Sequence, residues 1–324
     1  MARTKKDPSL DTVAEMAGVS AMTVSRMLTK PEVVSPDTRE RILAAMVRTG
    51  YVARKSTRTV GVLISSITNN TFASTIEGAR NILSPAGYEV LLGDIGYSDQ
   101  QAERVLAAIL SKRPDGLIIS SQDHTVKNRG LLSACRIPIV EVWDNPENPI
   151  DLTAGISHFE AGRLAAQHFI ERDYVNLAYF GTRTPRDEIR WHGFQSVAGT
   201  TAKFIEAEPG QAAIHSFKSG KNVLDYQRDL GQPVAVFCSS EVLACGTIFR
   251  CQAEGIGIPE DIAICSFGDT PIAEAVFPAL TSIRVPAMDM GAAAAQMVIN
   301  RLTGKPSKTN KQLFKLELVV RATS

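Results

Sequence analysis

Apolar residues between positions 10 and 28 recur in a pattern that predicts two short helices joined by a tight turn. In the first helix the apolar positions at helical spacing are Leu10, Val13, Ala14 and Ala17. Gly18 stands where that helix must end, and Ser20 can cap the next one. In the second helix the inward positions are Val24, Met27 and Leu28, which leaves on the outer face Ala21, Met22, Thr23, Ser25 and Arg26. The pattern is that of a helix-turn-helix, whose second helix enters the major groove of DNA.

A third helix is predicted to begin at Ser35 and Pro36, with the serine as cap and the proline in the first helical position, and to end at Gly50. Its expected core face consists of Ile42, Leu43, Ala45, Met46 and Val47. The chain is then polar and basic up to Thr59, which indicates a linker.

From residue 60 onward, short apolar runs alternate with amphipathic helical stretches, which is the rhythm of an α/β fold. The expected strands include residues 60–65, 88–92, 116–120, 139–143, 177–180, 234–238 and 262–266. Strands buried on both faces belong to parallel sheets. More than eight strands favour two doubly wound halves with a ligand cleft at the carboxyl ends of the strands.

Length and composition fit a globular protein of two or three domains, because 324 residues exceed one ordinary core and 44% are hydrophobic. No apolar run approaches the roughly 18 to 20 residues that span a bilayer, and the first residues lack the apolar segment of a signal peptide. We therefore expect a cytoplasmic protein without membrane contact. The five cysteines form no Cys-x-x-Cys pair and are expected to be buried thiols.

Charge is distributed unevenly although the net charge is only +1. Residues 1–58 contain eleven Lys or Arg against six Asp or Glu, so the remainder of the chain is acidic. A basic head on an acidic body favours phosphate contact through the head, while a merely solvated charged surface is the alternative.

Motifs of catalysis and of metal binding do not emerge. The chain has no Gly-x-Ser-x-Gly elbow, no His-Glu-x-x-His and no phosphate-binding loop. His158, Glu160 and His168 lack metal-ligand spacing and a third ligand. We expect no metal and no cofactor, and an enzyme is the less favoured class.

The head resembles that of the LacI/GalR repressor family in residues 10–26 and 34–41 and in Gly50-Tyr51. In the body, similar segments follow in the family's order at residues 64–72, 115–119, 190–194, 238–246 and 278–283. Residues 140–144 and 155–160 are most similar to the gluconate-operon repressor branch.

The resemblance implies three parts: a DNA-binding head (1–51), a shortened linker (52–59) and a periplasmic-binding-protein-like body (60–324) of two lobes. Lobe 1 is expected at about 60–155 and 285–307, and lobe 2 at about 156–284 and 308–324. The expected fold is thus α/β, with a small all-α head and two doubly wound parallel sheets.

For the head, the resemblance implies that Ala21, Met22 and Arg26 face base edges. The residues expected near phosphates or capping the helices are Thr12, Ser20, Thr23, Ser25, Ser35 and Thr38. Arginine can bind guanine through two hydrogen bonds, and small or apolar side chains fit against a thymine methyl group. A solvated helix arginine is the alternative for Arg26.

For the effector pocket, the positions carried over from the family are Phe72, Asp144, His158, Arg190, Ser240 and Gly268. The guanidinium of Arg190 could clamp a carboxylate or neighbouring hydroxyls, and a structural ion pair is the alternative. The large aromatics Phe72, Trp143 and Trp191 either pack on the apolar face of a sugar or belong to the core.

Three departures from the family pattern affect the expected ligand and the DNA complex. Ser240-Glu241 replaces Asn-Asp, and Gly268-Asp269 replaces an Asp pair, so ligands for sugar hydroxyls are partly lost. The linker is shorter than in relatives, which form a hinge helix that wedges into the minor groove. Either the head binds without that kink, which predicts reduced DNA bending, or operator binding is impaired.

These observations and the family resemblance together predict a homodimeric transcriptional regulator that binds double-stranded operator DNA, with a tetramer as the alternative assembly. It is expected to be a repressor controlled by a small sugar-type effector, such as gluconate or a keto-gluconate. The alternatives are a sugar-binding protein without effective DNA binding, because of the short linker, and an enzyme on a doubly wound scaffold.

Overall fold

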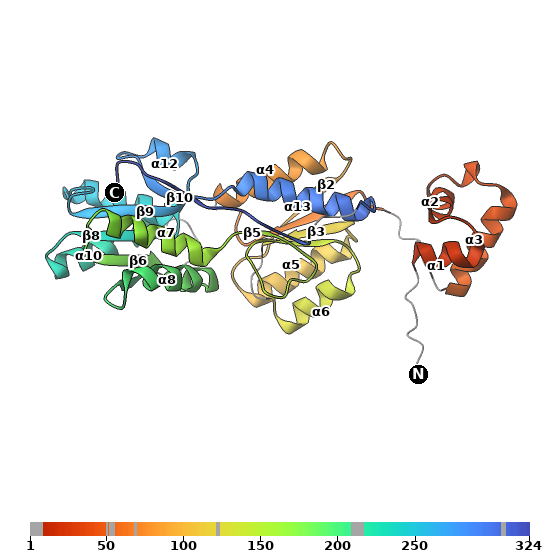
Figure 1. The fold of residues 1–324 in the computed structure, drawn as a ribbon, viewed down its shortest axis with the longest axis horizontal. Helices are drawn as coiled ribbons and strands as arrows, with labels where there is room; N and C mark the ends of the chain where they lie inside the picture. Colours follow the sequence, from red (N-terminus) through yellow and green to blue (C-terminus); the bar gives the residue numbers. More distant parts are fainter. Residues whose placement is uncertain are drawn as a thin grey trace. The chain divides into compact units, whose positions relative to one another are not determined.

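The chain divides into two structural units, Met1–Ser56 and Thr57–Ser324 (Figure 1). The computed structural model describes residues 9–49, 51, 56–67, 70–120, 124–208, 217–305 and 309–324. Helices make up the first unit, and two sheets covered by helices make up the second.

In the described part of the first unit, three α-helices and one 3-10 turn surround a small apolar core. They are α1 (Leu10–Ala17), α2 (Ala21–Thr29), η1 (Pro31–Val33) and α3 (Pro36–Thr49). Gly18 ends α1 in the left-handed conformation with φ 65°, and the Ser20 hydroxyl accepts a hydrogen bond from the Thr23 N–H at the start of α2. The predicted helix-turn-helix is confirmed, including its turn and cap.

The predicted core face of α3 was wrong at two positions. Ile42 and Ala45 are buried and Met46 is half-buried, but Leu43 and Val47 are exposed, Val47 by 84%. Positions 42, 45, 46 and 49 share one face of a helix with 3.6 residues per turn, whereas 43 and 47 lie about 100° away from it. The prediction placed Leu43 and Val47 on the core face because they are apolar, although the helical period places them away from the buried face.

The first lobe of the body contains a six-stranded parallel sheet in the order β11-β5-β4-β3-β1-β2. Its strands are β1 (Thr59–Ile64), β2 (Glu89–Asp94), β3 (Gly116–Ile119), β4 (Ile139–Trp143), β5 (Leu152–Gly155) and β11 (Lys311–Leu313). The helices of this lobe are α4 (Asn70–Leu83), α5 (Asp99–Ser111), α6 (Val126–Ala134) and α13 (Ala287–Leu302). The central strands β3 and β4 are buried throughout, as predicted, although β4 contains the buried Glu141 within its apolar run.

The second lobe contains a sheet in the order β12-β10-β9-β8-β6-β7, in which β12 alone runs antiparallel to its neighbour. Its strands are β6 (Leu177–Gly181), β7 (Lys203–Glu206), β8 (Val234–Cys238), β9 (Ile262–Gly268), β10 (Thr281–Arg284) and β12 (Glu317–Val319). The helices are α7 (His158–Glu171), α8 (Pro185–Ala198), α10 (Lys221–Leu230), α11 (Glu241–Glu254) and α12 (Pro271–Ala275). The predicted fold class is confirmed.

Three chain segments pass between the lobes: β5 to α7, β10 to α13, and β11 to β12. The last passage corrects the expected division, which gave all of residues 308–324 to lobe 2. Residues 311–313 pair with β5 and extend the sheet of lobe 1. The segment from β12 onward belongs to lobe 2, where β12 pairs with β10. The pairing of β11 was missed because this exposed three-residue strand carries no apolar run that would reveal its partner.

Helices α7 and α8 pack with their backbones in close contact, which fixes the residues at their amino-terminal ends. A Cβ atom added to Gly162 would lie 1.9 Å from the Arg190 carbonyl oxygen, and one added to Gly193 would lie 1.9 Å from the Phe159 carbonyl oxygen. Glycine is therefore required at both positions. This packing brings the start of α7, at His158, next to Arg190 of α8.

Candidate DNA-reading helix and effector site

Helix α2 presents a polar face to solvent. Its inward residues Val24 and Met27 are buried, while Met22 is 70% exposed and Ser25 and Arg26 are exposed. Ala21 and Thr23 are half-buried, and Ala21 packs against the head's core, so the outer face is narrower than the sequence predicted. The exposed residues form a strip that a DNA groove can reach.

Hydroxyl pairs cap the helices of the head. Thr12 and Thr23 lie 2.9 and 2.8 Å from the hydroxyls of Ser9 and Ser20, and the Ser35 hydroxyl donates to Thr38 at 2.8 Å. The N–H groups of Thr12, Thr23 and Thr38 also donate to these serines. Helix amino-terminal ends are favourable places for phosphate. The described residues expected near phosphates thus lie at helix starts, except Ser25.

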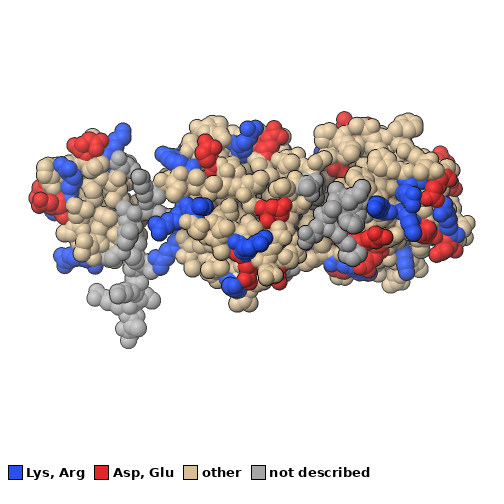
Figure 2. Space-filling view, turned by 180° about the vertical axis from the view of Figure 1, so that it is seen from behind, with Lys and Arg blue, Asp and Glu red and all other residues tan. Residues whose placement is uncertain are grey.

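Basic and acidic side chains are interspersed over the face of the body that Figure 2 shows. A broad area of positive charge is absent from that face among the described residues. Mixed charge of this kind is typical of a solvated surface. It leaves the assignment of phosphate contact to the basic head unchanged.

Asp144 is the centre of a contact between the lobes. It follows β4 in lobe 1, and only 2% of it is exposed. Arg186 of α8, in lobe 2, donates from Nε to Asp144 Oδ1 at 2.9 Å and from Nη2 to Oδ2. The same Nη2 donates to the Ser120 carbonyl oxygen at 3.0 Å. A guanidinium fork therefore holds the two lobes together through one buried carboxylate.

Arg190 lies one turn further along α8 and is engaged on every side within lobe 2. Its Nη2 donates to Asp187 Oδ1 at 2.6 Å, and its Nε donates to the Tyr179 hydroxyl at 3.2 Å. Its Nη1 lies 2.9 Å from His158 Nδ1, and its guanidinium lies 4.5 Å from the centre of the Phe267 ring. A guanidinium can only donate, so His158 Nδ1 accepts and Nε2 carries the proton. That Nε2 lies 3.3 Å from Asp144 Oδ1.

The charges of this network balance. Burial would raise the pKa of Asp144, but the charge of Arg186 lowers it far below its usual value. Burial likewise opposes ionisation of Asp187, yet Arg190 and the Thr182 hydrogen bonds lower its pKa to about 2. Burial lowers the pKa of His158 to about 4. Two arginines thus face two carboxylates and a neutral imidazole.

The structure unites some of the other predicted site residues with this network and separates others. Phe72 packs beneath Arg186, with 5.9 Å from the guanidinium to the ring centre, and lies edge-to-face with Trp143. Gly268 directly follows Phe267. Ser240 caps α11 through a hydrogen bond from the Leu243 N–H. Trp191 belongs to the core, where it stacks on Phe194.

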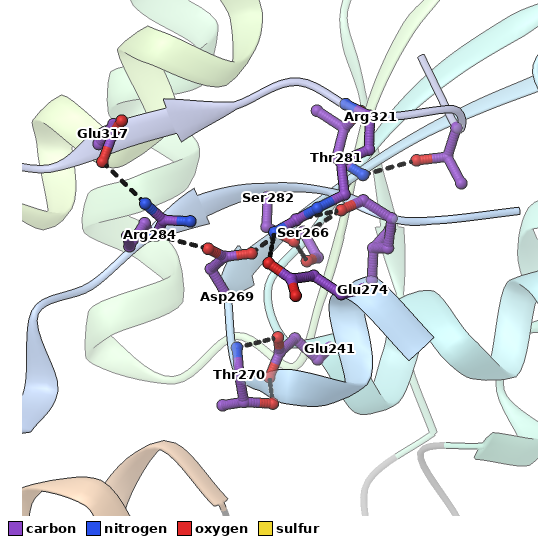
Figure 3. Close-up of polar contacts among 12 residues, drawn as sticks. Glu241, Ser266, Asp269, Thr270, Glu274, Thr281, Ser282, Arg284, Glu317 and Arg321 are labelled. Carbon is purple, nitrogen blue, oxygen red and sulfur yellow. Dashed lines mark hydrogen bonds and ion pairs between the residues drawn. The ribbon is translucent and has the colours of Figure 1, made fainter. Parts of the chain in front are cut away.

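The end of β9 carries a second group of buried charges, drawn in Figure 3. Glu241 accepts hydrogen bonds from the Thr270 N–H at 2.6 Å and the Thr270 hydroxyl at 2.7 Å. Its Oε2 would lie 3.0 Å from a Cβ at Gly268, so its carboxylate occupies the space beside that glycine. Asp269 lies between Arg284 and Arg321, each donating to it at 2.6 Å. This group ties β10 and the segment after β12 to β9.

Sequence reasoning missed Arg186, Asp187, Tyr179 and Glu241 as members of these sites. A signal existed for Arg186, because it precedes Arg190 by one helical turn and so lies on the same face of α8. Its partner Asp144 is 42 positions away in the other lobe, and spacing alone does not reveal such a contact.

Comparison with known proteins identifies the family. Residues 9–53 match the bacterial regulatory proteins of the lacI family, and residues 166–324 match the periplasmic binding protein-like domain. The HTH-type transcriptional regulator GntR of Escherichia coli strain K12 is 33% identical over 322 residues, covering 95% of this chain and 96% of that protein. The chain belongs to the LacI family of bacterial regulatory proteins.

Other relatives of this LacI-family chain agree with that assignment. The regulator IdnR of Escherichia coli strain K12 is 28% identical and covers 93% of this chain and 94% of its own length. The crystal structure of a LacI-family regulator from Silicibacter pomeroyi is 29% identical, covers 98% of this chain and 99% of its own, and has a TM-score of 0.75. The prediction of a DNA-binding transcriptional regulator rather than an enzyme is confirmed.

Two histidines of α7 in the LacI-family chain have partners within the body. His158 contacts Asp144 and Arg190, whereas His168, on the same helix, lies 2.8 Å from the Ser324 hydroxyl. Within the described ranges, no group of three His, Cys, Asp or Glu could hold a metal ion. Four cysteines are buried thiols, and Cys135 is half-buried. Among the helices that the structure describes, none is long and apolar enough to cross a membrane.

His158 predicts a stability loss at mildly acidic pH. Its pKa is about 4 in the folded chain, against 6.5 when unperturbed. Between these values the unfolded chain takes up a proton that the folded chain does not, so stability falls as pH drops from 6.5 to 4, by about 3 kcal/mol in total. Urea unfolding at pH 7.5 and 4.5 measures the loss.

Two variants isolate this contribution, because other groups also titrate in the window. His158→Gln removes the ionisable group, so its unfolding free energy falls less between the two pH values than that of the wild type. His192→Gln, which alters an exposed histidine of α8, retains the full loss. An equal loss in wild type and His158→Gln would contradict the prediction.

Proposed function

We propose that this LacI-family regulator is a homodimeric repressor whose operator affinity is controlled by a sugar acid, such as gluconate or a keto-gluconate. The observation that supports a carboxylate ligand best is the pair Arg186 and Arg190, one turn apart and both in the network around Asp144. Planar guanidinium groups bind carboxylates through two parallel hydrogen bonds. Carbonyl and carboxylate oxygens beside them can accept from sugar hydroxyls.

The ligand is proposed to act by competing with Asp144 for Arg186. The Arg186–Asp144 contact links the two lobes, so an anion that takes over the guanidinium changes how the lobes close on each other. In a dimer, lobe movement changes the spacing of the two heads. Effector and operator then weaken each other's binding by the same factor.

For the head, we propose that Met22, Ala21 and Arg26 read base edges. The exposure of Met22 and Arg26 supports this assignment. The residues proposed to lie near phosphates are Thr12, Ser20, Thr23, Ser25, Ser35 and Thr38. The hydroxyls among them that cap the helices bond within the head, so phosphate would accept from the hydroxyl protons that remain available and from N–H groups at helix starts.

Dimerisation is supported by apolar residues on the surface of the body. Phe277 is 82% exposed, and Phe249 of α11 is 48% exposed. Lobe 1 exposes Leu92 on the edge strand β2. Large exposed aromatics are characteristic of interface residues. Two heads on a pseudo-palindromic operator multiply weak half-site binding, and because the partner is DNA we propose that the protein acts in the cytoplasm.

The short linker favours a second candidate function, a sugar-binding protein without effective DNA binding. Residues 52–55 lie outside the described ranges, but the linker's end is fastened to the body. The Thr57 hydroxyl donates to the Arg113 carbonyl oxygen at 3.1 Å, and the Arg58 N–H donates to Asp115 at 2.9 Å. Operator titration separates the two candidates, because only a regulator binds operator at physiological salt.

Calorimetry tests the proposed ligand class. The wild type is titrated with gluconate, keto-gluconates and glucose, and we expect binding of a sugar acid but not of glucose. Arg186→Gln should weaken that binding by about tenfold or more, because a bidentate charged contact is lost. Arg163→Gln, which alters an exposed ion pair of α7, should bind as the wild type. Binding of neutral hexose alone would remove the sugar-acid proposal.

A further inference from the structure

Trp143 has an unusual position beside the effector network. It is the last residue of β4, and its backbone has a φ of 79°, a left-handed conformation that bulky residues rarely adopt. Trp143 is paired in register with Gly155, and a Cβ at Gly155 would lie 1.8 Å from the Asp144 carbonyl oxygen. Strain of this kind clusters at ligand sites.

The indole ring is buried near the contact between the lobes. Only 3% of Trp143 is exposed, and its ring lies edge-to-face with Phe72, 5.0 Å between centres. Phe72 in turn lies beneath Arg186. Trp143 therefore belongs to the group of residues around the Arg186–Asp144 contact between the lobes.

Two buried N–H donors in this group lack a well-aligned acceptor. Trp143 Nε1 has no hydrogen-bond partner among the described residues. His158 Nε2, which carries the ring proton, lies 3.3 Å from Asp144 Oδ1 but without the alignment of a hydrogen bond. Buried indole N–H groups nearly always find a partner. His158 Nε2 lies beside Asp144, and Trp143 directly precedes Asp144 in the chain. A ligand rich in oxygen acceptors could satisfy both donors.

We propose that the indole N–H of Trp143 donates a hydrogen bond to a hydroxyl or carboxylate oxygen of the effector and so helps to determine its specificity. The proposal rests on the proposed function, since it assigns a residue to the same effector site. It gives Trp143 a role that packing alone does not, because a phenylalanine would fill most of the same space. The residue is a donor in a site otherwise dominated by charge.

Trp143→Phe tests the donor role, since it retains an aromatic ring against Phe72 and removes the N–H. We expect the free protein to melt at the same or a higher temperature, because an unpartnered buried donor is removed. Sugar-acid affinity in calorimetry should fall by about tenfold. Trp191→Phe, which alters a core tryptophan, should bind within about twofold of the wild type. A purely packing role predicts a lower melting temperature and unchanged affinity.

Fluorescence gives a second readout, because the chain has two tryptophans. In Trp191→Phe the emission comes from Trp143, and saturating sugar acid should change its wavelength and intensity. If the wild type binds sugar acid, two results would overturn the role of Trp143 while leaving the proposed function intact. One is an unchanged affinity in Trp143→Phe, and the other is an unchanged emission in Trp191→Phe. A wild type that binds no sugar acid would overturn both.

Discussion

Asp187→Ala lowers the free energy of unfolding by about 3–5 kcal/mol, because it leaves a buried arginine without its charge partner. Arg190 is only 6% exposed, and its Nη2 donates to Asp187 at 2.6 Å. Asp187 also accepts from the Thr182 N–H and hydroxyl and from the Tyr179 hydroxyl. The substitution leaves several buried donors unpaired at once. Urea unfolding at pH 7.5 measures the change.

Glu188→Ala is the matched control for this prediction. Glu188 is the next residue of α8 and pairs with Arg183 at 3.0 Å, but both side chains are well exposed. Exposed pairs contribute under about 1 kcal/mol. If Asp187→Ala and Glu188→Ala destabilise the protein equally, Arg190 is not held by a buried ion pair and the description of the network is wrong.

Arg26→Ala is expected to weaken operator binding by about tenfold or more for each half-site that the protein contacts, because it removes the side chain proposed to bind guanine through two hydrogen bonds. The loss is largest on the cognate operator and small on unrelated DNA, since a base contact carries sequence information and a phosphate contact does not. Fluorescence anisotropy with labelled duplexes, at one fixed salt concentration, measures both affinities.

Arg48→Ala is the control that separates the loss of a base contact from the loss of a positive charge. Arg48 lies exposed near the end of α3 and carries the same charge as Arg26. Its removal should weaken binding to cognate and to unrelated DNA by a similar factor, which is smaller than the loss that Arg26→Ala causes on the cognate operator. An Arg26→Ala protein that loses the same factor on both kinds of DNA would assign Arg26 to phosphate contact instead.

Local sequence signals predicted much of the fold because they act over a few residues. Ser20 capped α2, Gly18 ended α1, and apolar runs such as residues 234–238 became buried strands. Short strands escaped detection for the same reason. β5 and β7 have only four residues each, and β11 is exposed throughout and carries no apolar run. Their pairing depends on partners far along the chain.

The proposed effector site was predictable only where the family pattern named the residues. Asp144, His158 and Arg190 meet in one network. The pattern did not show that Arg186 binds Asp144, nor that the Glu241 carboxylate lies beside Gly268. Both are contacts between elements that only tertiary packing brings together.

The most direct test of the central claim is an operator titration by fluorescence anisotropy with and without saturating gluconate. We expect salt-dependent binding of a pseudo-palindromic duplex, and we expect gluconate to weaken that binding. Calorimetry should show that operator weakens gluconate binding by the same factor. Operator binding that gluconate and keto-gluconates leave unchanged, in a protein shown to bind one of them, would contradict control of the head by the effector site.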